Sequence, residues 1–172
     1  RLLGVSLTGI MDHEVLNNVF GPVRDYLDVM RTHSVEVNKE WANKLGVSPS
    51  AAITTVKPSG TVSQLVDSSS GIHPRFAHYY IRTVRNDKKD PLSQFMIDKG
   101  IPHETDIMKD SNWVFSFPMK APSHAKIASE MTALEQLEHY LVYSKHWTEH
   151  NPSITVYVLS LIHISEPTRP ER

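Results

Sequence analysis

The stretch Ala51-Ala52-Ile53-Thr54-Thr55-Val56-Lys57-Pro58-Ser59-Gly60-Thr61-Val62-Ser63-Gln64-Leu65-Val66 decides the fold of this chain. Its first six residues are small or β-branched and predict a strand. Residues 57–62 form a turn, and residues 63–66 are helix-like. Because the first amides of a helix have no partner inside the helix, a strand-to-helix turn of this kind is able to hold a phosphate.

Residue types inside the turn agree with anion binding. Pro58 removes an amide that has no intrahelical partner anyway, and Gly60 allows a ligand to approach the main chain closely. Ser59 and Thr61 add hydroxyl donors beside the amides. Lys57 stands within side-chain reach of a second or third phosphate, although it is equally able to point to solvent. Simple helix capping is the alternative function of the same pattern.

The wider sequence resembles the late barrel segment of class II, adenosylcobalamin-dependent ribonucleotide reductases. In its details it is most similar to the monomeric ribonucleoside-triphosphate reductases. The resemblance covers roughly residues 1–158. It is carried by stretches in the family's order: residues 51–63, Ser69-Ser70-Gly71-Ile72-His73-Pro74-Arg75-Phe76, Tyr79 to Asp87 with Asp90-Pro91-Leu92, and Trp147-Thr148-Glu149-His150-Asn151-Pro152-Ser153-Ile154-Thr155-Val156-Tyr157.

This resemblance implies an α/β fold, a fragment of the ten-stranded α/β barrel of ribonucleotide reductases. It implies that Pro58, Ser59, Gly60, Thr61 and Val62 cradle the phosphates of a ribonucleoside triphosphate. It also implies adenosylcobalamin as cofactor, deoxynucleotide effectors and a thioredoxin-like reductant for the full-length enzyme. Such enzymes work through a cysteine thiyl radical and a reducing cysteine pair, yet the chain has no cysteine. We therefore expect no catalytic residue here and no activity of the fragment alone.

Composition is that of a piece of an enzyme. With 172 residues, 40% hydrophobic and 22% charged, the chain is long enough for one core but short for two domains. A formal net charge of −1 gives no general attraction to nucleic acid, and the absence of a long apolar run argues against a membrane span. The absence of cysteine and of a leader predicts a cytoplasmic setting. The start at Arg1 rather than Met suggests an internal piece.

The end of the chain has a different character. Residues 159–169, Leu-Ser-Leu-Ile-His-Ile-Ser-Glu-Pro-Thr-Arg, resemble the translated read-through of a sequencing adapter. We expect residues 1–158 to be a partial reductase barrel domain and residues 159–172 to be a non-native tail. A natural amphipathic tail is the alternative.

Spacing of apolar residues predicts the remaining elements. One long helix is expected between Gly21-Pro22 and Gly46, with a stripe at three- and four-residue steps. A short helix is expected from Asp90-Pro91 to Gly100, and another after the capping box at Thr132 to Glu135. Strands are expected at residues 78–84, 113–117 and 154–158, and their alternation with helices predicts parallel barrel staves. The predicted stripes are Val23, Leu27, Met30, Ser34, Val37, Trp41 and Leu45 in the long helix, and Leu134, Leu137 and Leu141 in the last.

Other patterns offer competing functions. His146-Trp147-Thr148-Glu149-His150 spells the H-x-x-E-H zinc signature of inverted-motif metallopeptidases, although Asn151-Pro152 breaks the helix directly afterwards. Solvent-facing histidines at a helix end are the alternative, and we expect no metal. A non-catalytic nucleotide-binding module is a further alternative. The cations Arg82, Arg85, Lys88 and Lys89 either attract a polyphosphate or belong to a solvated loop, and His73 is either a turn residue or a ligand contact.

Overall fold

A computed structural model describes residues 4–158 of the chain. The described residues form two compact units, residues 4–75 with 124–158, and residues 76–123. The stretch predicted to be a non-native tail, residues 159–172, lies outside the described residues. Among residues 4–158, none of the helices combines the length and the apolar character that crossing a bilayer requires.

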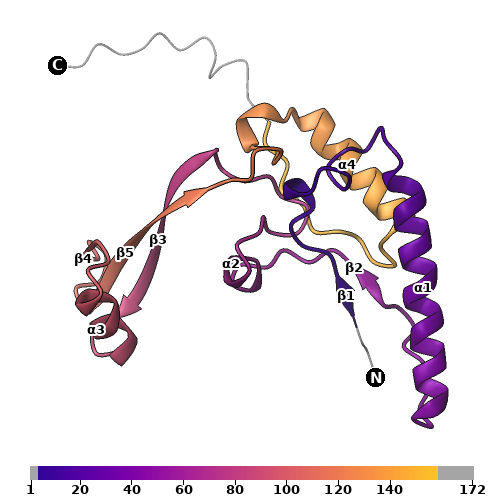
Figure 1. The fold of residues 1–172 in the computed structure, drawn as a ribbon, viewed down its shortest axis with the longest axis horizontal. Coiled ribbons are helices and arrows are strands. Elements are labelled where there is room, and N and C mark those ends of the chain that lie inside the picture. The colour runs from indigo at the N-terminus through magenta and orange to yellow at the C-terminus, as the bar shows by residue number, and fades with distance from the viewer. Residues whose placement is uncertain (1–3, 159–172) are drawn as a thin grey trace. The chain divides into compact units, whose positions relative to one another are not determined.

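The first unit is built on a parallel strand pair joined by a helix (Figure 1). Strand β1 (Val5–Ser6) pairs in parallel with β2 (Thr54–Thr55), with Val5 opposite Thr54. A 3-10 turn, η1 (Ile10–Asp12), and helix α1 (Val23–Lys44) lie between them in sequence. The predicted strand at residues 51–56 is thus confirmed at its centre. Sequence analysis did not predict β1, because two strand residues are too few for a periodic signal.

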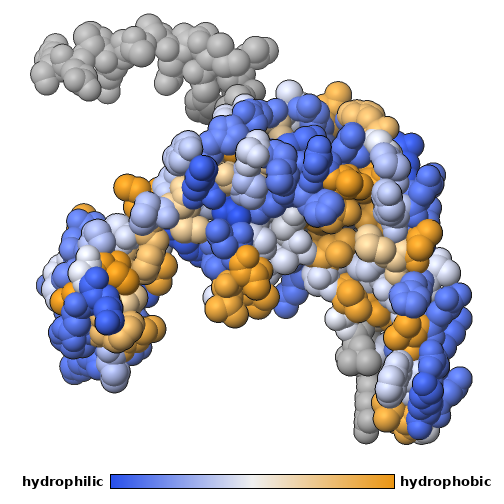
Figure 2. All heavy atoms as spheres, in the orientation of Figure 1, coloured by the Kyte–Doolittle hydropathy of each residue, from blue (hydrophilic) through white to orange (hydrophobic). Residues whose placement is uncertain are grey.

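Helix α1 confirms the long predicted helix. Pro22 is its N-cap, and Gly46, which follows it, has a φ of +63°, the left-handed conformation that ends helices. Val23 and Leu27 are fully buried, as the stripe predicts. The lower half of the stripe is exposed, however, since Trp41 is 54% accessible, and Figure 2 shows hydrophobic residues on the surface there. This half, with Val37 and Leu45, lines an apolar pocket of about 540 Å³ together with Val5 of β1 and Ile53, which precedes β2.

Helix α4 (Ala133–His146) starts at the predicted capping box. The Glu135 amide donates to the Thr132 hydroxyl (3.2 Å), and the Thr132 amide donates to the Glu135 carboxylate (2.7 Å). The predicted buried stripe is wrong, because Leu134, Leu137 and Leu141 are 67%, 44% and 63% exposed. The helix instead buries a face rich in polar residues, which forms hydrogen bonds with the segment that precedes α1. Its buried residues are Gln136, His139, Val142 and Tyr143.

Two side chains explain this orientation of α4. The Tyr143 hydroxyl donates to the Leu16 carbonyl oxygen (2.8 Å), and His139 Nε2 lies 2.9 Å from the Asn17 carbonyl oxygen. Burial raises the pKa of Tyr143 well above its usual value, so the phenol keeps its proton. The hydrophobic core beside them comprises Ile10, Met11, Val19, Val23, Leu27, Val56, Ile72, Met131, Val142, Tyr143 and Trp147.

The second unit is an antiparallel sheet with one short helix. Strand β5 (Asn112–Lys120) lies between β3 (Tyr79–Asp87) and β4 (His103–Thr105), and both neighbours are antiparallel to it. The predicted helix is present as α3 (Pro91–Asp98), with the Asp90 carboxylate capping the Leu92 amide (2.8 Å). The strands expected at 78–84 and 113–117 therefore exist, but the prediction that they are parallel staves is wrong. Asp87, the last residue of β3, pairs with Asn112, the first residue of β5, so the two strands run in opposite directions.

The strand expected at residues 154–158 is also not formed. The backbone there bonds side chains rather than a neighbouring strand: the Thr155 amide donates to His73 Nε2 (3.0 Å) and the Tyr157 amide to Gln136 Oε1 (3.3 Å). A short 3-10 turn, η2 (Ala128–Glu130), precedes α4. The described residues thus form a mixed α/β structure in which only β1 and β2 are a parallel strand pair.

Candidate functional site

The predicted strand, turn and helix around the Pro58 turn are confirmed. Strand β2 ends at Thr55, and helix α2 (Val62–Leu65) begins after the turn with Thr61 as its N-cap. The turn opens onto a pocket of about 380 Å³. Residues 57–62 of the turn line this pocket. Ser6 at the end of β1 and Thr8 line it as well. The lining residues are Ser6, Thr8, Lys57, Pro58, Ser59, Gly60, Thr61 and Val62.

Helix α2 is a single turn, so a helix dipole contributes little to this pocket. Individual donors matter instead. Within residues 4–158, the amides of Thr61 and Val62 donate to no other residue. Lys57 is exposed at the rim and its ammonium has no described partner. The structure therefore brings the predicted site residues together around one open pocket that combines amide donors, hydroxyls and one cation.

A second loop supports the turn from behind. The Ser59 amide donates to the Ser70 hydroxyl (2.9 Å), and the Ser63 hydroxyl donates to the Ser59 carbonyl oxygen. Gly71 lies so close that a Cβ there would meet the Lys57 carbonyl oxygen at 3.1 Å, and its φ is +56°. Both observations require glycine at this position. At Gly60, by contrast, an added Cβ meets no atom within 4 Å, which leaves space on the pocket side.

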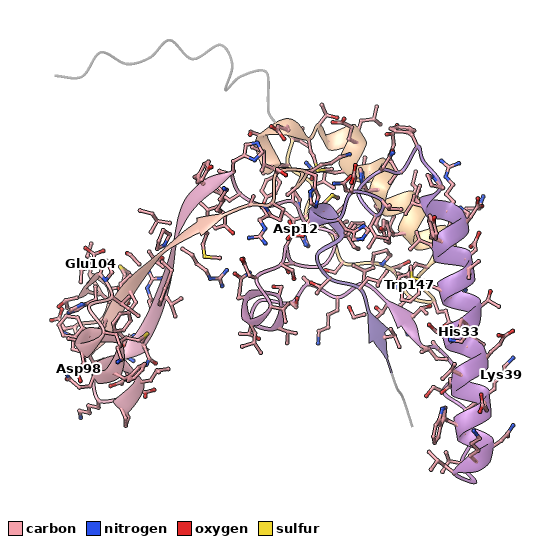
Figure 3. All side chains as sticks on the ribbon, viewed as in Figure 1. Asp12, His33, Lys39, Asp98, Glu104 and Trp147 are labelled. Atoms are coloured by element: carbon pink, nitrogen blue, oxygen red, sulfur yellow. The ribbon has the colours of Figure 1, made fainter. Side chains whose placement is uncertain are left out.

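A buried ion pair holds this second loop. Three guanidinium contacts of 2.9–3.1 Å join Arg75 to the carboxylate of Asp12, which Figure 3 labels. The two side chains are 2% and 11% exposed. Asp12 also accepts the Ser69 amide (2.7 Å), and Arg75 reaches Asp67 (3.0 Å). Sequence analysis missed both roles, because Asp12 carried no motif and Arg75 was noted only within the family-like stretch.

Glu149 is a second residue with a role that sequence analysis missed. Its carboxylate accepts the amides of Ile53 (2.5 Å) and Thr54 (3.0 Å) at the edge of β2. Burial raises the pKa of this carboxyl, but the two amide bonds outweigh burial and the pKa lies below its usual value. Trp147 is 1% exposed, and its indole N–H donates to the Thr55 carbonyl oxygen (2.8 Å). The segment after α4 therefore fixes the strand that leads into the turn.

These contacts rule out the zinc site. Helix α4 ends at His146, so His146 and His150 do not lie one turn apart on a helix face. His146 bonds Asp28 (2.9 Å) instead, and Glu149 is engaged by β2. No group of three or more His, Asp or Glu side chains able to hold a metal occurs among the described residues.

Two cations of the charged run have described partners within the second unit. Arg85 pairs with Asp106 (3.0 Å), and Lys88 lies 4.1 Å from the centre of the Trp113 ring. These contacts favour the structural interpretation of the charged run. His73 is a turn residue, since its Nδ1 lies 3.1 Å from the Ser70 carbonyl oxygen while Nε2 accepts the Thr155 amide.

The fold defined here is that of part of a class II ribonucleotide reductase. A crystal structure of a B12-dependent (class II) ribonucleotide reductase superimposes with a TM-score of 0.78, at 24% identity, over 90% of this chain and 26% of that one. No protein-family model matches the chain.

Curated relatives agree at the level of sequence. The adenosylcobalamin-dependent ribonucleoside-triphosphate reductase of Levilactobacillus brevis is 33% identical over 91% of this chain, and that of Lactobacillus acidophilus is 29% identical over the same share. A probable enzyme of the same name from Dictyostelium discoideum is 28% identical. The chain spans about a quarter of the length of the two bacterial relatives. It is therefore homologous to one part of adenosylcobalamin-dependent ribonucleotide reductases.

Proposed function

We propose that this chain is part of the catalytic barrel of an adenosylcobalamin-dependent ribonucleoside-triphosphate reductase. Such an enzyme converts ribonucleotides to deoxyribonucleotides, and the role proposed for this part is to bind the phosphates of the substrate. Partners of the full-length protein would be a ribonucleoside triphosphate, deoxynucleotide effectors and a thioredoxin-like reductant. The support is the relationship to enzymes of that name over 91% of the chain.

One observation carries the site assignment: the family-like turn is the wall of an open pocket and not merely a helix cap. Residues 58–62 line this pocket, the amides of Thr61 and Val62 have no described partner, and Lys57 adds a positive charge at the rim. Phosphate oxygens accept such hydrogen bonds strongly, because bonds to a charged acceptor are about twice as strong as neutral ones. The residues proposed to form the phosphate site are Lys57, Pro58, Ser59, Gly60, Thr61 and Val62.

Radical chemistry is assigned to other parts of the protein. The chain has no cysteine and hence no thiol to carry a thiyl radical. The pockets at the turn and beneath α1, about 380 and 540 Å³, have the size of small-molecule sites and do not fit a group as large as a corrinoid. We therefore assign no cobalamin contact to the described residues.

Substitution of Gly60 tests the proposed phosphate site. In the full-length protein that contains this segment, Gly60→Glu places a carboxylate at the pocket, while the open space around this position allows the fold to persist. Losing one charge-assisted hydrogen bond costs roughly 1.5–3 kcal/mol, and like-charge repulsion adds to it. We expect the affinity for a ribonucleoside triphosphate, measured by calorimetry, to fall at least about tenfold.

Ser69→Ala is the matched control. Its hydroxyl is buried and has no hydrogen-bond partner among the described residues, so its removal should leave nucleotide affinity unchanged. If Gly60→Glu stayed folded and bound the triphosphate as the parent does, the phosphate role of the turn would be wrong.

Residues 159–172 are proposed to be a non-native tail, as their adapter-like sequence indicates. The curated relatives align with 91% of the chain, which leaves room for an unrelated stretch of this length. Resequencing the source across residue 158 should replace the tail with sequence that continues the reductase. The same codons in an independent amplicon would contradict this proposal.

A further inference from the structure

Hydrogen bonds around Thr8 determine where the hydroxyl protons of the pocket point. Thr8 Oγ1 donates its single proton to the Ser69 carbonyl oxygen (3.0 Å) and accepts the Gly71 amide (3.0 Å). It also lies 3.2 Å from Ser59 Oγ. Since a hydroxyl has one proton and two lone pairs, the Thr8 proton is already committed and Ser59 must be the donor in this contact. Thr8 is therefore fully bonded and holds the turn in place.

This assignment changes the role of Ser59. Its hydroxyl proton points to Thr8 and its amide proton points to Ser70 (2.9 Å). Toward the pocket, Ser59 Oγ offers only lone pairs, which repel an anion. Although Ser59 belongs to the family-like turn, its side chain thus supports the pocket's shape more than it binds phosphate.

Ser6 shows the opposite arrangement. It lines the same pocket from the end of β1, where it pairs with Thr55, and its Oγ accepts the Lys57 amide (3.0 Å). This bond uses a lone pair and leaves the hydroxyl proton without an acceptor among the described residues. Because Ser6 is exposed, the proton is able to point into the open pocket.

We propose that Ser6 is an anion-binding residue of this pocket, donating its hydroxyl proton to a phosphate oxygen from the end of β1, while Thr8 is the positioning residue. The proposal rests on the phosphate-binding function proposed above. It adds a hydrogen-bond donor from β1 to the donors that the turn provides. It also predicts that the β1 serine contributes more to anion affinity than the serine inside the family-like turn.

Inorganic tripolyphosphate is the appropriate probe, because it carries the charge of a nucleotide tail and no base. Its affinity for the full-length protein is measured by calorimetry for the parent and for Ser6→Ala, Ser6→Thr, Ser59→Ala and Ser48→Ala. Ser6→Ala is expected to lose about tenfold in affinity, the usual effect of one charge-assisted bond, and Ser6→Thr to restore most of it. Ser59→Ala should lose less than Ser6→Ala. Ser48, exposed and without a described hydrogen bond, is the matched serine control.

The outcomes separate the two proposals. Equal affinity of Ser6→Ala and the parent, or a larger loss in Ser59→Ala than in Ser6→Ala, overturns the assignment of Ser6, even where Gly60→Glu abolishes binding. Unchanged binding in Gly60→Glu overturns the phosphate site itself. Ser6→Ala also removes the acceptor of the Lys57 amide, so hydrogen exchange of residues 59–62 is measured without ligand in the parent and in Ser6→Ala. Unchanged exchange together with a lower affinity supports a direct contact of Ser6 with the anion, whereas faster exchange across the turn assigns the loss to the turn and overturns the direct contact.

Discussion

The two compact units hold an Arg–Asp pair in opposite environments. In the first unit, Arg75 and Asp12 are 2% and 11% exposed, and the pair ties the loop behind the pocket to η1. In the second, Arg85 is 59% exposed while Asp106 is 5% exposed, and the pair spans β3 and the segment before β5. An exposed ion pair is weak because water screens it, whereas breaking a buried one leaves a charge without solvent. We therefore expect the first unit to depend on its pair more than the second unit does, since Arg85 stays in water and Asp106 also accepts the Met108 amide (3.1 Å).

The largest expected effect follows from breaking the buried pair. Asp12→Ala removes the least exposed described carboxylate partner of the buried Arg75 guanidinium, and it also removes the acceptor of the Ser69 amide. We expect the full-length protein to lose about 4 kcal/mol of stability against urea. Arg85→Ala is the matched control in the second unit and should cost less, about 1–2 kcal/mol, because the buried Asp106 carboxylate keeps the Met108 amide as a donor. Equal losses in the two variants would contradict the comparison.

The next effect contrasts the two ends of α1. Leu27 is fully buried in the core of the first unit, and Leu27→Ala removes its methyl groups and leaves a cavity, at a cost of about 3 kcal/mol. Leu45 carries the same side chain on the same helix but is 68% exposed. In the isolated chain, Leu45→Ala should change the free energy of unfolding by less than about 0.5 kcal/mol.

The exposed end of α1 is also expected to affect aggregation of the isolated chain. The apolar pocket beneath Trp41 and Leu45 is open in the described residues, and such surfaces favour association. Trp41→Lys is therefore expected to reduce aggregation of the isolated chain, measured by light scattering, more than Lys39→Ala does on another face of the helix. If the isolated chain instead behaves as a stable monomer with a sharp melting transition, the segment is a complete domain.

Sequence alone predicted those features that local chemistry determines. Pro22 and Gly46 bound α1, Thr132 and Glu135 start α4, and Asp90-Pro91 starts α3, because caps depend on neighbouring residues. The turn at residues 57–62 was predicted for the same reason.

Features that depend on distant partners were not predictable in this way. The pairing of β3 with β5 is antiparallel, yet alternation of strands and a helix suggested parallel staves, since strand propensity carries no direction. The buried face of α4 was misassigned because its leucines satisfy helical spacing, while His139 and Tyr143 find carbonyl partners more than 100 residues away. Thr8 and Asp12 belong to no motif, and the family-like stretch around Arg75 does not name its partner, because these roles depend on tertiary hydrogen bonds.

The smallest effect concerns the edge of β2, where the two units again differ in how they use a glutamate. Glu149 accepts the amides of Ile53 and Thr54 in the first unit, whereas Glu104 on β4 of the second unit is exposed and accepts no described hydrogen bond. Burial opposes ionisation of Glu149, but the amide bonds prevail and its pKa lies below the ordinary value of 4.5. A carboxyl whose pKa is lowered by folding stabilises the folded state above its unfolded pKa, and this contribution is lost as the pH falls through the folded value.

We therefore expect the Ile53 and Thr54 amides to lose protection from hydrogen exchange below about pH 4.5, after correction for the intrinsic pH dependence of exchange. In Glu149→Gln this acid step should disappear, because the amide side chain does not titrate, and protection at neutral pH should already be lower. Glu104→Gln is the matched control and should keep the step of the parent protein. An acid step that persists in Glu149→Gln would assign it to another group, and the carboxylate would then not be what fixes β2 ahead of the phosphate turn.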